Sequence, residues 1–471
     1  MVGSARESPS NTCSTMRLPM RMRLFALLVV VAALASCSTW FSTKPLPLDP
    51  FALELLGASE QQLATLAAGS ERGLIELAPI HLPVDPPGDC NHYGWPIGTM
   101  VGDTIVVMHR RIPGHWGPET PRPVKDGPTS AEPNERMSYG VILRSTDGGM
   151  TWSEPYDLRR SMRSVDRYRG GVVPLSHRTK FAIDNKSLRG YKIHLHSIGT
   201  TRDGAVLAMN NHGVFRSEDQ GCTWSHFSKT FRDDTFPHEL VNLGPRILDD
   251  PDEGLMAFGN WYGPPGQPTE LEEDLRKAFL ILKSPDGGAT WVPEEHDSMG
   301  YAQYEGNAIR HGDAFYIISR NSLKQGLLQV WYRPGEPVRI VEPNMAQTRD
   351  TSDLIYNPVT KRFEVVQSAR KLMSMILWSI APEEWFTGKW RKECVLFRRR
   401  GRFLGYGLQP GEIVADGFHA GGGVLDSARG VQHIFFYTGH PNGPAGVFRL
   451  TRTLDTPALV SFLKEDLRYG R

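Results

Sequence analysis

A short segment that occurs three times constrains the fold of this chain more than any other feature. The copies are Ser145–Trp152, Ser217–Trp224 and Ser284–Trp291, and they share the pattern Ser-x-Asp-x-Gly-x-Thr-Trp. Each follows an apolar run, such as Gly140–Leu143 or Ala278–Leu282, that is typical of a β-strand. In a turn, Ser and Asp side chains can bond backbone amides, while Gly supplies left-handed backbone angles. The pattern therefore predicts a repeated strand–turn–strand unit in which the Trp fills the gap between neighbouring sheets.

Apolar runs separated by turns recur in six units from about residue 75 onward, and the first three units keep the complete motif. The runs are 104–108, 204–209, 254–258, 314–318 with 328–332, 363–366 with 375–378, and 433–437 with 446–450. This arrangement predicts an all-β, six-bladed β-propeller over residues 75–455, which avoids long exposed sheet edges by closing on itself. A seven-bladed propeller is the alternative, with its extra blade built from residues 75–90 and 385–405.

Short helices and long loops are expected around the propeller. Residues 52–68 have a helix-forming composition, and Thr456-Pro457 is a favourable start for a C-terminal helix over 456–471. Residues 113–135 are rich in Pro and Gly and predict a long loop. Residues 157–192 carry many Arg and Lys side chains, which predict either a solvated mobile loop or a positive lip that attracts anionic glycans.

The first 36 residues resemble a signal peptide. Basic residues precede the apolar run Leu24–Ala35, which is too short for a comfortable membrane span. The following Leu34-Ala35-Ser36-Cys37 resembles a bacterial lipobox, which implies cleavage before Cys37 and a lipid on its sulfur. Residues 37–74 would then be a lipid-anchored tether and short helix. We expect an extracytoplasmic protein on a bacterial membrane, with Ser38 favouring the outer membrane; an ordinary signal peptide or an uncleaved anchor is the alternative.

Composition excludes several classes of function. The 53 Lys and Arg residues nearly balance 52 Asp and Glu residues, which argues against a general nucleic-acid binder. The 47 Gly and 35 Pro residues suit many turns between short strands and disfavour a helical bundle. No pair among the five cysteines has zinc-ligand spacing. We therefore expect no metal and no cofactor, and a monomer.

The repeated motif resembles the Asp box, or BNR repeat, of sialidases (neuraminidases) and related β-propellers. The resemblance implies a propeller over about residues 75–455 and, most simply, a sialidase-like glycoside hydrolase acting on acidic glycans. In that family the Asp boxes lie on the rim away from the active site. We therefore interpret the three copies here as structural.

The same resemblance selects catalytic candidates. In sialidases a glutamate opens a strand at the start of a blade and an arginine ends the next strand, an arrangement that Glu305 and Arg320 match. The family glutamate assists a tyrosine nucleophile, for which Tyr437 is our candidate, and the arginine is one of three that bind a carboxylate. A guanidinium can bind a carboxylate through two hydrogen bonds, and a carboxylate can draw the proton from a tyrosine. A surface ion pair is the alternative interpretation of Glu305 and Arg320.

One family arginine is missing from its expected place. It belongs to a Phe/Tyr-Arg-Ile-Pro motif before the first strand, and the aligned segment here is Tyr93-Gly94-Trp95-Pro96. This departure argues against a complete set of three. Arg110 or Arg111, from the strand's other end, are candidates for the missing charge, and Arg349 for another member of the set.

Histidines near expected strand ends suggest a second kind of chemistry. The candidates for substrate binding are His109, His115, His419 and His440. A His/Tyr pair can abstract a proton next to a uronate carboxylate that an arginine has neutralised. A uronate-directed polysaccharide lyase using His92, His109 or His115, or another glycosidase, is therefore the alternative. No pair of catalytic carboxylates typical of glycosidases is evident, and a non-catalytic glycan- or protein-binding propeller is the third hypothesis.

Overall fold

The computed structural model describes most of the chain from residue 50 onward. The described residues are 50–57, 75–83, 91–112, 139–158, 197–209, 214–228, 240–262, 278–297, 299, 301, 303–321, 326–346, 350–403, 413–418, 421–441 and 443–455. They belong to one compact unit, Leu46–Arg471. The expectations for Cys37, His115, Arg349 and His419, for the signal peptide, for the loop 113–135 and for the C-terminal helix lie outside them, as does nearly all of 157–192.

Within this part of the chain the structure is nearly all β. The helices are α2 (Pro50–Leu56) and the 3-10 helices η2 (Arg370–Leu372) and η3 (Pro382–Thr387). Helix α2 covers only the first part of the range 52–68 in which a helix was expected, because it ends at Leu56 and is followed by a turn at Gly57; residues 58–74 are not described. Among the described residues, no helix combines the length and apolar character needed to cross a bilayer.

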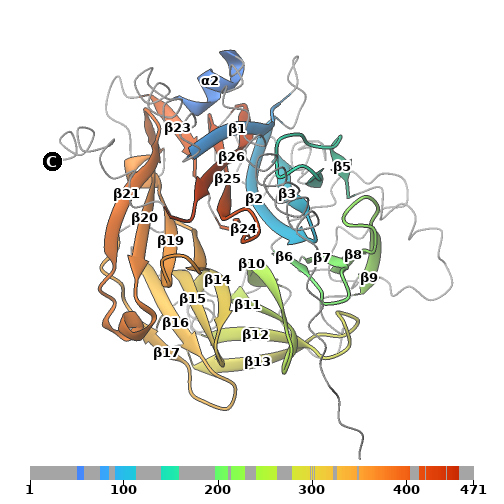
Figure 1. Ribbon diagram of the computed structural model, residues 1–471, viewed down its shortest axis with the longest axis vertical. Helices are drawn as coiled ribbons and strands as arrows, with labels where there is room; N and C mark the ends of the chain where they lie inside the picture. The colour runs from blue at the N-terminus through green and yellow to red at the C-terminus, as the bar shows by residue number, and fades with distance from the viewer. Residues whose placement is uncertain are drawn as a thin grey trace, which may run out of the picture. The chain divides into compact units, whose positions relative to one another are not determined.

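The strands form antiparallel four-stranded units that follow one another along the chain (Figure 1). Unit 1 has β2 (His92–Val101), β3 (Thr104–Ile112), β4 (Tyr139–Ser145) and β5 (Tyr156–Asp157). Unit 2 has β6 (Ser197–Thr200), β7 (Val206–Met209), β8 (Val214–Ser217) and β9 (Ser225–Ser228). Unit 3 has β10 (Leu240–Asp250), β11 (Gly254–Tyr262), β12 (Ala278–Ser284) and β13 (Val292–Asp297).

The next two units repeat the arrangement without an Asp box. Unit 4 has β14 (Gln303–His311), β15 (Ala314–Asn321), β16 (Leu327–Tyr332) and β17 (Arg339–Val341). Unit 5 has β18 (Ser352–Asn357), β19 (Arg362–Ala369), β20 (Ser374–Ile380) and β21 (Arg391–Arg398).

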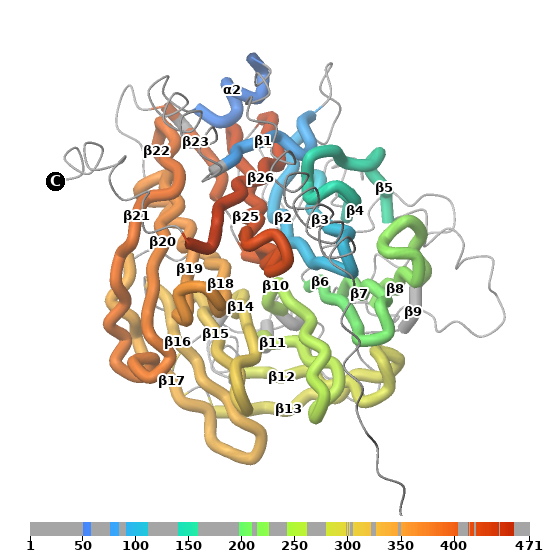
Figure 2. The backbone as a smooth tube through the Cα atoms, viewed as in Figure 1, coloured from blue at the N-terminus to red at the C-terminus, as the bar shows by residue number. Residues whose placement is uncertain are grey.

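The last unit combines strands from both ends of the described chain. Its members are β22 (Arg402–Phe403), β23 (Val414–Gly417), β24 (Val424–Asp426), β25 (Val431–Gly439), β26 (Ala445–Thr453) and β1 (Ile75–His81). Strands β23 and β24 pair with opposite ends of β25, and β1 pairs with β26 on the far side. Figure 2 shows the blue tube of β1 beside the red β26. A seventh blade would need the segments 75–90 and 385–405. The first contributes β1 to unit 6, and the second contributes β21 to unit 5 and β22 to unit 6.

The first strands of successive units lie side by side, from β2 through β6, β10 and β14 to β18. Single parallel bridges join β6 to β10 and β2 to β26, which merges units into larger sheets. A buried carboxylate, Asp353 on β18, receives hydrogen bonds from three other units: Arg246 at 2.7 Å, Asn307 at 3.0 Å and Gln432 at 2.7 Å. The first strands are therefore held together by polar contacts at their inner edge.

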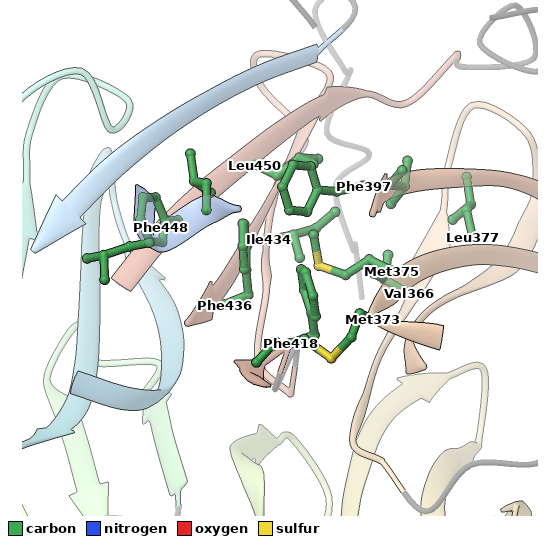
Figure 3. Close-up of a cluster of buried hydrophobic side chains, with 14 of the residues drawn as sticks. Val366, Met373, Met375, Leu377, Phe397, Phe418, Ile434, Phe436, Phe448 and Leu450 are labelled. Atoms are coloured by element: carbon green, nitrogen blue, oxygen red, sulfur yellow. The ribbon is translucent and has the colours of Figure 1, made fainter. Parts of the chain in front are cut away.

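The apolar core lies between neighbouring units. One cluster joins unit 5 to unit 6 and packs Met375, Phe397 and Phe418 against Phe436 and Phe448 (Figure 3). Strand residues alternate between the two faces of a sheet, so each sheet presents one apolar face to the unit before it and one to the unit after it. The runs predicted as strands from the sequence form β3, β4, β7, β11, β12, β15, β16, β19, β20, β25 and β26.

The three Asp-box turns share one hydrogen-bond pattern. In the first, Ser145 Oγ donates to Asp147 at 2.7 Å and accepts from the Gly149 amide, also at 2.7 Å. Asp147 also accepts from the Thr151 amide at 2.9 Å, and Trp152 Nε1 donates to the Gly149 carbonyl. The other two copies repeat these bonds within 0.2 Å. The predicted use of Ser, Asp and Gly in these turns is confirmed.

An arginine from the preceding unit caps each of these turns. Arg449 on β26 donates to the Gly148 carbonyl, Arg144 on β4 to Gln220, and Arg216 on β8 to Gly287, at 2.7 to 3.4 Å. Unit 4 has no Asp box, and Lys283 stands where unit 3 would supply the arginine. It bonds Glu253 and Tyr332 instead. The motif thus also serves to join units.

Candidate functional site

Two strands that open a unit carry the same backbone irregularity near their start. The register of β2 against β3 shifts between Gly94 and Ile97, and that of β14 against β15 shifts between Tyr304 and Asn307. Inside the shifts, Trp95 has φ 53° and Glu305 has φ 52°. This left-handed conformation is unfavourable for residues other than Gly and is concentrated at functional sites in proteins. We therefore built the candidate site around these two residues.

Glu305 and Arg320 form an ion pair at this edge. Arg320 Nη1 donates to Glu305 Oε2 at 2.6 Å, and the side chains are 16% and 24% exposed for glutamate and arginine. The cross-strand register places Tyr304 opposite Arg320, which explains how β14 and β15 bring the two side chains together. The structure thus brings together two residues selected from the sequence, at a position that solvent can reach.

A buried guanidinium, that of Arg370, lies at the centre of the groups behind this pair. Arg370 follows β19 in η2, and its Nη2 donates to Tyr437 Oη at 3.1 Å while its Nε donates to the Gly417 carbonyl at 2.9 Å. Asp350 accepts from the Arg370 amide at 2.9 Å and lies 3.7 Å from Nε. Burial alone would lower the pKa of Arg370, but the neighbouring Tyr437 and acidic groups raise it, so the guanidinium stays charged.

Tyr437 and His92 share a second buried carboxylate, Asp416. Tyr437 Oη lies 3.4 Å from Asp416 Oδ1, and His92 Nε2 lies 3.4 Å from Oδ2. His92 Nδ1 faces the carbonyl oxygens of His440 and Gly443 at 3.3 and 3.4 Å, so it carries a proton. The ring of His92 meets that of Tyr437 edge to face at 5.4 Å. Phenol, imidazole and carboxylate are therefore positioned to exchange a proton.

Burial dominates the titration of these groups. It raises the pKa of Tyr437 well above its usual value; the Arg370 charge opposes this effect and Asp416 adds to it. Burial also lowers the pKa of His92, against the opposing effect of Asp416. In the structure as it stands, Tyr437 is therefore a neutral phenol and His92 a neutral imidazole at neutral pH.

The site has an exposed layer and a buried layer. Trp95, Arg110, Glu305 and Arg320 are partly exposed, whereas Tyr437 and the four groups around it are almost completely buried. The Trp95 ring lies 5.2 Å from that of Tyr437 and 5.9 Å from that of His92. Arg110, which pairs with Gly94 across the strands, holds its guanidinium 5.4 Å from the Trp95 ring. A Cβ at Gly94 would meet His92 and Tyr437 at 3.6 Å, so that position faces the buried layer.

His109 and Arg111 lie on the face of β3 opposite to Arg110, because side chains alternate along a strand. His109 Nε2 bonds His81 Nδ1 at 2.7 Å, and both rings pack on Tyr93, over which Arg111 also stands at 4.7 Å. Burial lowers the pKa of His109 well below its usual value and, with the Arg111 charge, that of His81 to about 4. The structure therefore places this pair in a separate buried cluster beneath β1.

The remaining sequence candidates contribute less or are not described. The side chain of His440 is exposed, and its main-chain carbonyl is what contacts His92. Arg349, His115 and His419 lie outside the described residues. Among those that are described, no cluster of three or more potential metal ligands occurs.

Sequence reasoning gave no role to Arg370, Asp350, Asp416 or Trp95. Arg370 and Asp350 belong to no recognisable motif. An isolated Arg or Asp next to a predicted strand is usually a surface residue, so neither was expected to be buried. Asp416 lies three residues before His419 and next to Gly417, in a stretch that also holds Gly421, Gly422 and Gly423, and this glycine content was the available signal. Trp95 replaces the isoleucine of the family motif, and that departure could have marked it.

Comparisons with known proteins show a shared fold and leave activity open. No family model matches the chain. A curated xyloglucanase from a Paenibacillus species is 27% identical over 191 residues, which are 38% of this chain and 16% of the relative. The chain thus spans about a sixth of that relative's length.

Solved structures match over most of the chain at low identity. A protein of unknown function from Dyadobacter fermentans is 14% identical with a TM-score of 0.52, covering 80% of this chain and 99% of that one. This match shows a shared fold. A Hadza microbial sialidase is 13% identical with a TM-score of 0.46, covering 78% and 66%. The structural neighbours also include a sialidase from Trypanosoma rangeli, an α-L-arabinofuranosidase from Fusarium graminearum and an intramolecular trans-sialidase from Ruminococcus gnavus, with TM-scores of 0.46 to 0.48.

Proposed function

We propose that this chain is a glycoside hydrolase that cleaves acidic glycans, with Glu305 and Tyr437 as its catalytic residues. One observation carries the proposal: Glu305, which is partly exposed and paired with Arg320, interacts electrostatically with Arg370, and Arg370 contacts a tyrosine whose phenol also approaches Asp416. A tyrosine needs both a proton acceptor and a nearby cation to act as a nucleophile. Asp416 and Arg370 are those two groups.

The chemistry proceeds in two steps. Tyr437 Oη bonds the anomeric carbon while the bond from that carbon to the leaving oxygen breaks, and the phenol proton passes to Asp416. Glu305, in its protonated form, gives a proton to the leaving oxygen. It then takes a proton from a water whose oxygen bonds the anomeric carbon as the bond from that carbon to Tyr437 Oη breaks, and Asp416 returns its proton to restore the phenol. Arg370 stabilises the phenolate that forms transiently, and Asp350 holds Arg370 in place.

The substrate class follows from charge in the exposed layer. Arg110 and Arg320 face the site with Glu305 as the single acidic side chain among the exposed residues named above, which favours an anionic sugar. Gly94 stands where the family has an arginine, and Arg110 on the neighbouring strand is the cation nearest that position by register. A sialoside is therefore the first substrate to test.

We also propose that the units are the blades of a six-bladed propeller. Support comes from the succession of four-stranded units, from β1 as the outer strand of unit 6, and from the contacts of Asp353 with units 3, 4 and 6. In a propeller, the ends of the first strands line a central funnel. That places Glu305 and Trp95 at its mouth.

The test assays the full-length protein on a fluorogenic sialoside, on a fluorogenic α-L-arabinofuranoside and on uronate polysaccharides followed by the absorbance of unsaturated products. We expect sialoside cleavage, with kcat/KM reduced about 10²–10⁴-fold in Glu305→Gln and Tyr437→Phe. Glu336→Gln serves as the matched control, because Glu336 forms an exposed ion pair with Arg333. Its activity should stay within about twofold of the wild type, as expected for exposed pairs.

A lyase remains the second candidate because His92 and Tyr437 lie together beside an arginine that could neutralise a uronate. Absorbance growth without release of the fluorophore, lost in Tyr437→Phe and retained in Glu305→Gln, would replace the hydrolase proposal by that reaction. Silence on all substrates would favour a binding propeller and contradict both.

A further inference from the structure

Trp95 separates Tyr437 from solvent in this structure. Tyr437 is fully buried, and the partly exposed indole of Trp95 lies against it with ring centroids 5.2 Å apart. The same indole also covers His92, at 5.9 Å. The indole is therefore a partly exposed group that lies against both buried rings of the site.

The backbone at Trp95 indicates that its position matters. An indole residue at φ 53° is strained, and the strain is maintained by the register shift of β2 against β3. Glu305 stands in the corresponding shift of β14 with nearly the same φ, and it is the exposed carboxyl of the site. The same register shift with a left-handed residue thus positions a carboxyl group on β14 and an aromatic ring on β2.

The chemistry of Trp95 suits a sugar. The less polar face of a sugar ring can pack on an aromatic face, and tryptophan offers the largest such surface. Arg110 holds its guanidinium 5.4 Å from the ring, where it can contact an acidic substituent of a sugar packed there.

We infer that Trp95 is a substrate-contacting residue: it covers Tyr437 in the free protein and packs against the sugar ring when Tyr437 is reached. The identity of the sugar rests on the proposed function. The covering of Tyr437 by Trp95 rests on the geometry alone.

The first experiment needs no substrate. Tetranitromethane nitrates accessible tyrosines, and peptide mapping locates the modified residues. Tyr437 should be protected in the wild type and in Trp95→Phe, and modified at least about tenfold faster in Trp95→Ala. Tyr332, also fully buried, serves as the internal reference and should stay protected throughout. Unchanged protection of Tyr437 in Trp95→Ala would overturn the inference.

The second experiment measures equilibrium binding of 3′-sialyllactose and arabinobiose in the Glu305→Gln background. Adding Trp95→Ala should weaken binding of the preferred sugar about tenfold, and Trp95→Phe should keep it within about threefold. Phe386→Ala is the matched control, since Phe386 is an exposed aromatic residue whose ring lies 3.7 Å from the Arg339 guanidinium. Equal binding with and without Trp95, or no binding of either sugar by the parent, would overturn the inference.

These outcomes separate the inference from the proposed function. Binding and labelling that depend on Trp95, without any cleavage by the wild type, would support the inference and contradict the hydrolase. Cleavage by the wild type with KM unchanged in Trp95→Ala would support the hydrolase and contradict the inference. If Trp95→Ala does not fold, Trp95→Gly replaces it, because glycine adopts a left-handed φ without strain.

Discussion

The two ends of the four-stranded units use left-handed backbone in different ways. At the Asp-box end, five of the six residues with positive φ in the turns are glycines and the sixth is the exposed Gln220, while the side chains of Ser and Asp satisfy the turn amides; the glycines are Gly148, Gly149, Gly221, Gly287 and Gly288. At the end where β2 and β14 begin, Trp95 and Glu305 adopt the same angles with large side chains. The register places these ends on opposite sides of a unit, since Ser145 pairs with Ile105 and His92 with Ile112.

The difference separates stability from function. Glycine accepts a positive φ at no steric cost, so the other residues of the Asp-box turn can form hydrogen bonds and contact the next unit. A tryptophan or glutamate in the same conformation is disfavoured by about 1–2 kcal/mol. The chain tolerates that cost where a side chain must be presented at a fixed place. Four predictions test this division.

The largest effect is expected in the buried layer of the site. Arg370→Gln leaves Asp350 and Asp416 buried without their cation, and breaking such a pair costs about 3–5 kcal/mol. Denaturant unfolding should show this loss. Arg216→Gln, which removes the partner of the exposed Asp203 and Glu218 at the Asp-box end, should cost less than about 1 kcal/mol. Similar losses in the two variants would contradict the division.

A pH effect is expected from the cluster beneath β1. Burial, followed by the Arg111 charge, lowers the folded-state pKa of His81 from 6.5 to about 4, so the unfolded chain binds the proton more readily. The contribution of neutral His81 to the free energy of unfolding is therefore complete above pH 6.5. It is lost as the pH falls toward 4, which lowers the free energy of unfolding by up to about 3 kcal/mol. Unfolding free energies measured from pH 7 to 4 should fall less steeply in His81→Gln. An unchanged slope would show that His81 titrates normally.

An intermediate effect is expected at the Asp-box end. Asp286→Ala removes the acceptor of three bonds, from Ser284 and from the amide and hydroxyl of Thr290, and at about 1 kcal/mol per bond should cost about 3 kcal/mol. Activity per folded molecule should not change. Asp252→Ala, which removes an exposed partner of Arg310, is the control and should cost less than about 1 kcal/mol. A loss of activity at constant folded fraction would show that the two ends are coupled.

The smallest effect sharpens the comparison at a single residue. Lys361 is exposed in the turn between β18 and β19 and has φ 55°, without a role in the site. Lys361→Gly should raise stability by about 0.5 kcal/mol, because relief of strain exceeds the added entropy of the unfolded chain. Thermal unfolding checks the sign. Destabilisation would mean that left-handed backbone at non-glycine residues is not costly in this fold.

The sequence predicted the parts of the molecule that depend on local pattern. The Asp boxes, the strands and the proximity of Glu305 to Arg320 follow from residues close together in the chain, whose turns and pairings are decided locally. The buried layer joins Arg370, Asp416 and His92, which lie up to 324 positions apart in the printed sequence. Such contacts depend on how units pack, and no periodicity in one chain reveals them. His109 and Arg110 were equally good candidates for substrate binding in the sequence, because they are neighbours at the end of one predicted strand. The register of that strand shows that their side chains lie on opposite faces of the sheet.

The pairing of β1 with β26 has a consequence for the order of events during synthesis. Strand β1 is made before any other described strand, yet its partner ends at Thr453. At about 5–20 residues per second, the ribosome needs on the order of tens of seconds to travel between them. Throughout that interval β1 has an unpaired edge, and closing so long a loop makes this contact slow to form. Completion of the last unit therefore reports that synthesis has passed Thr453.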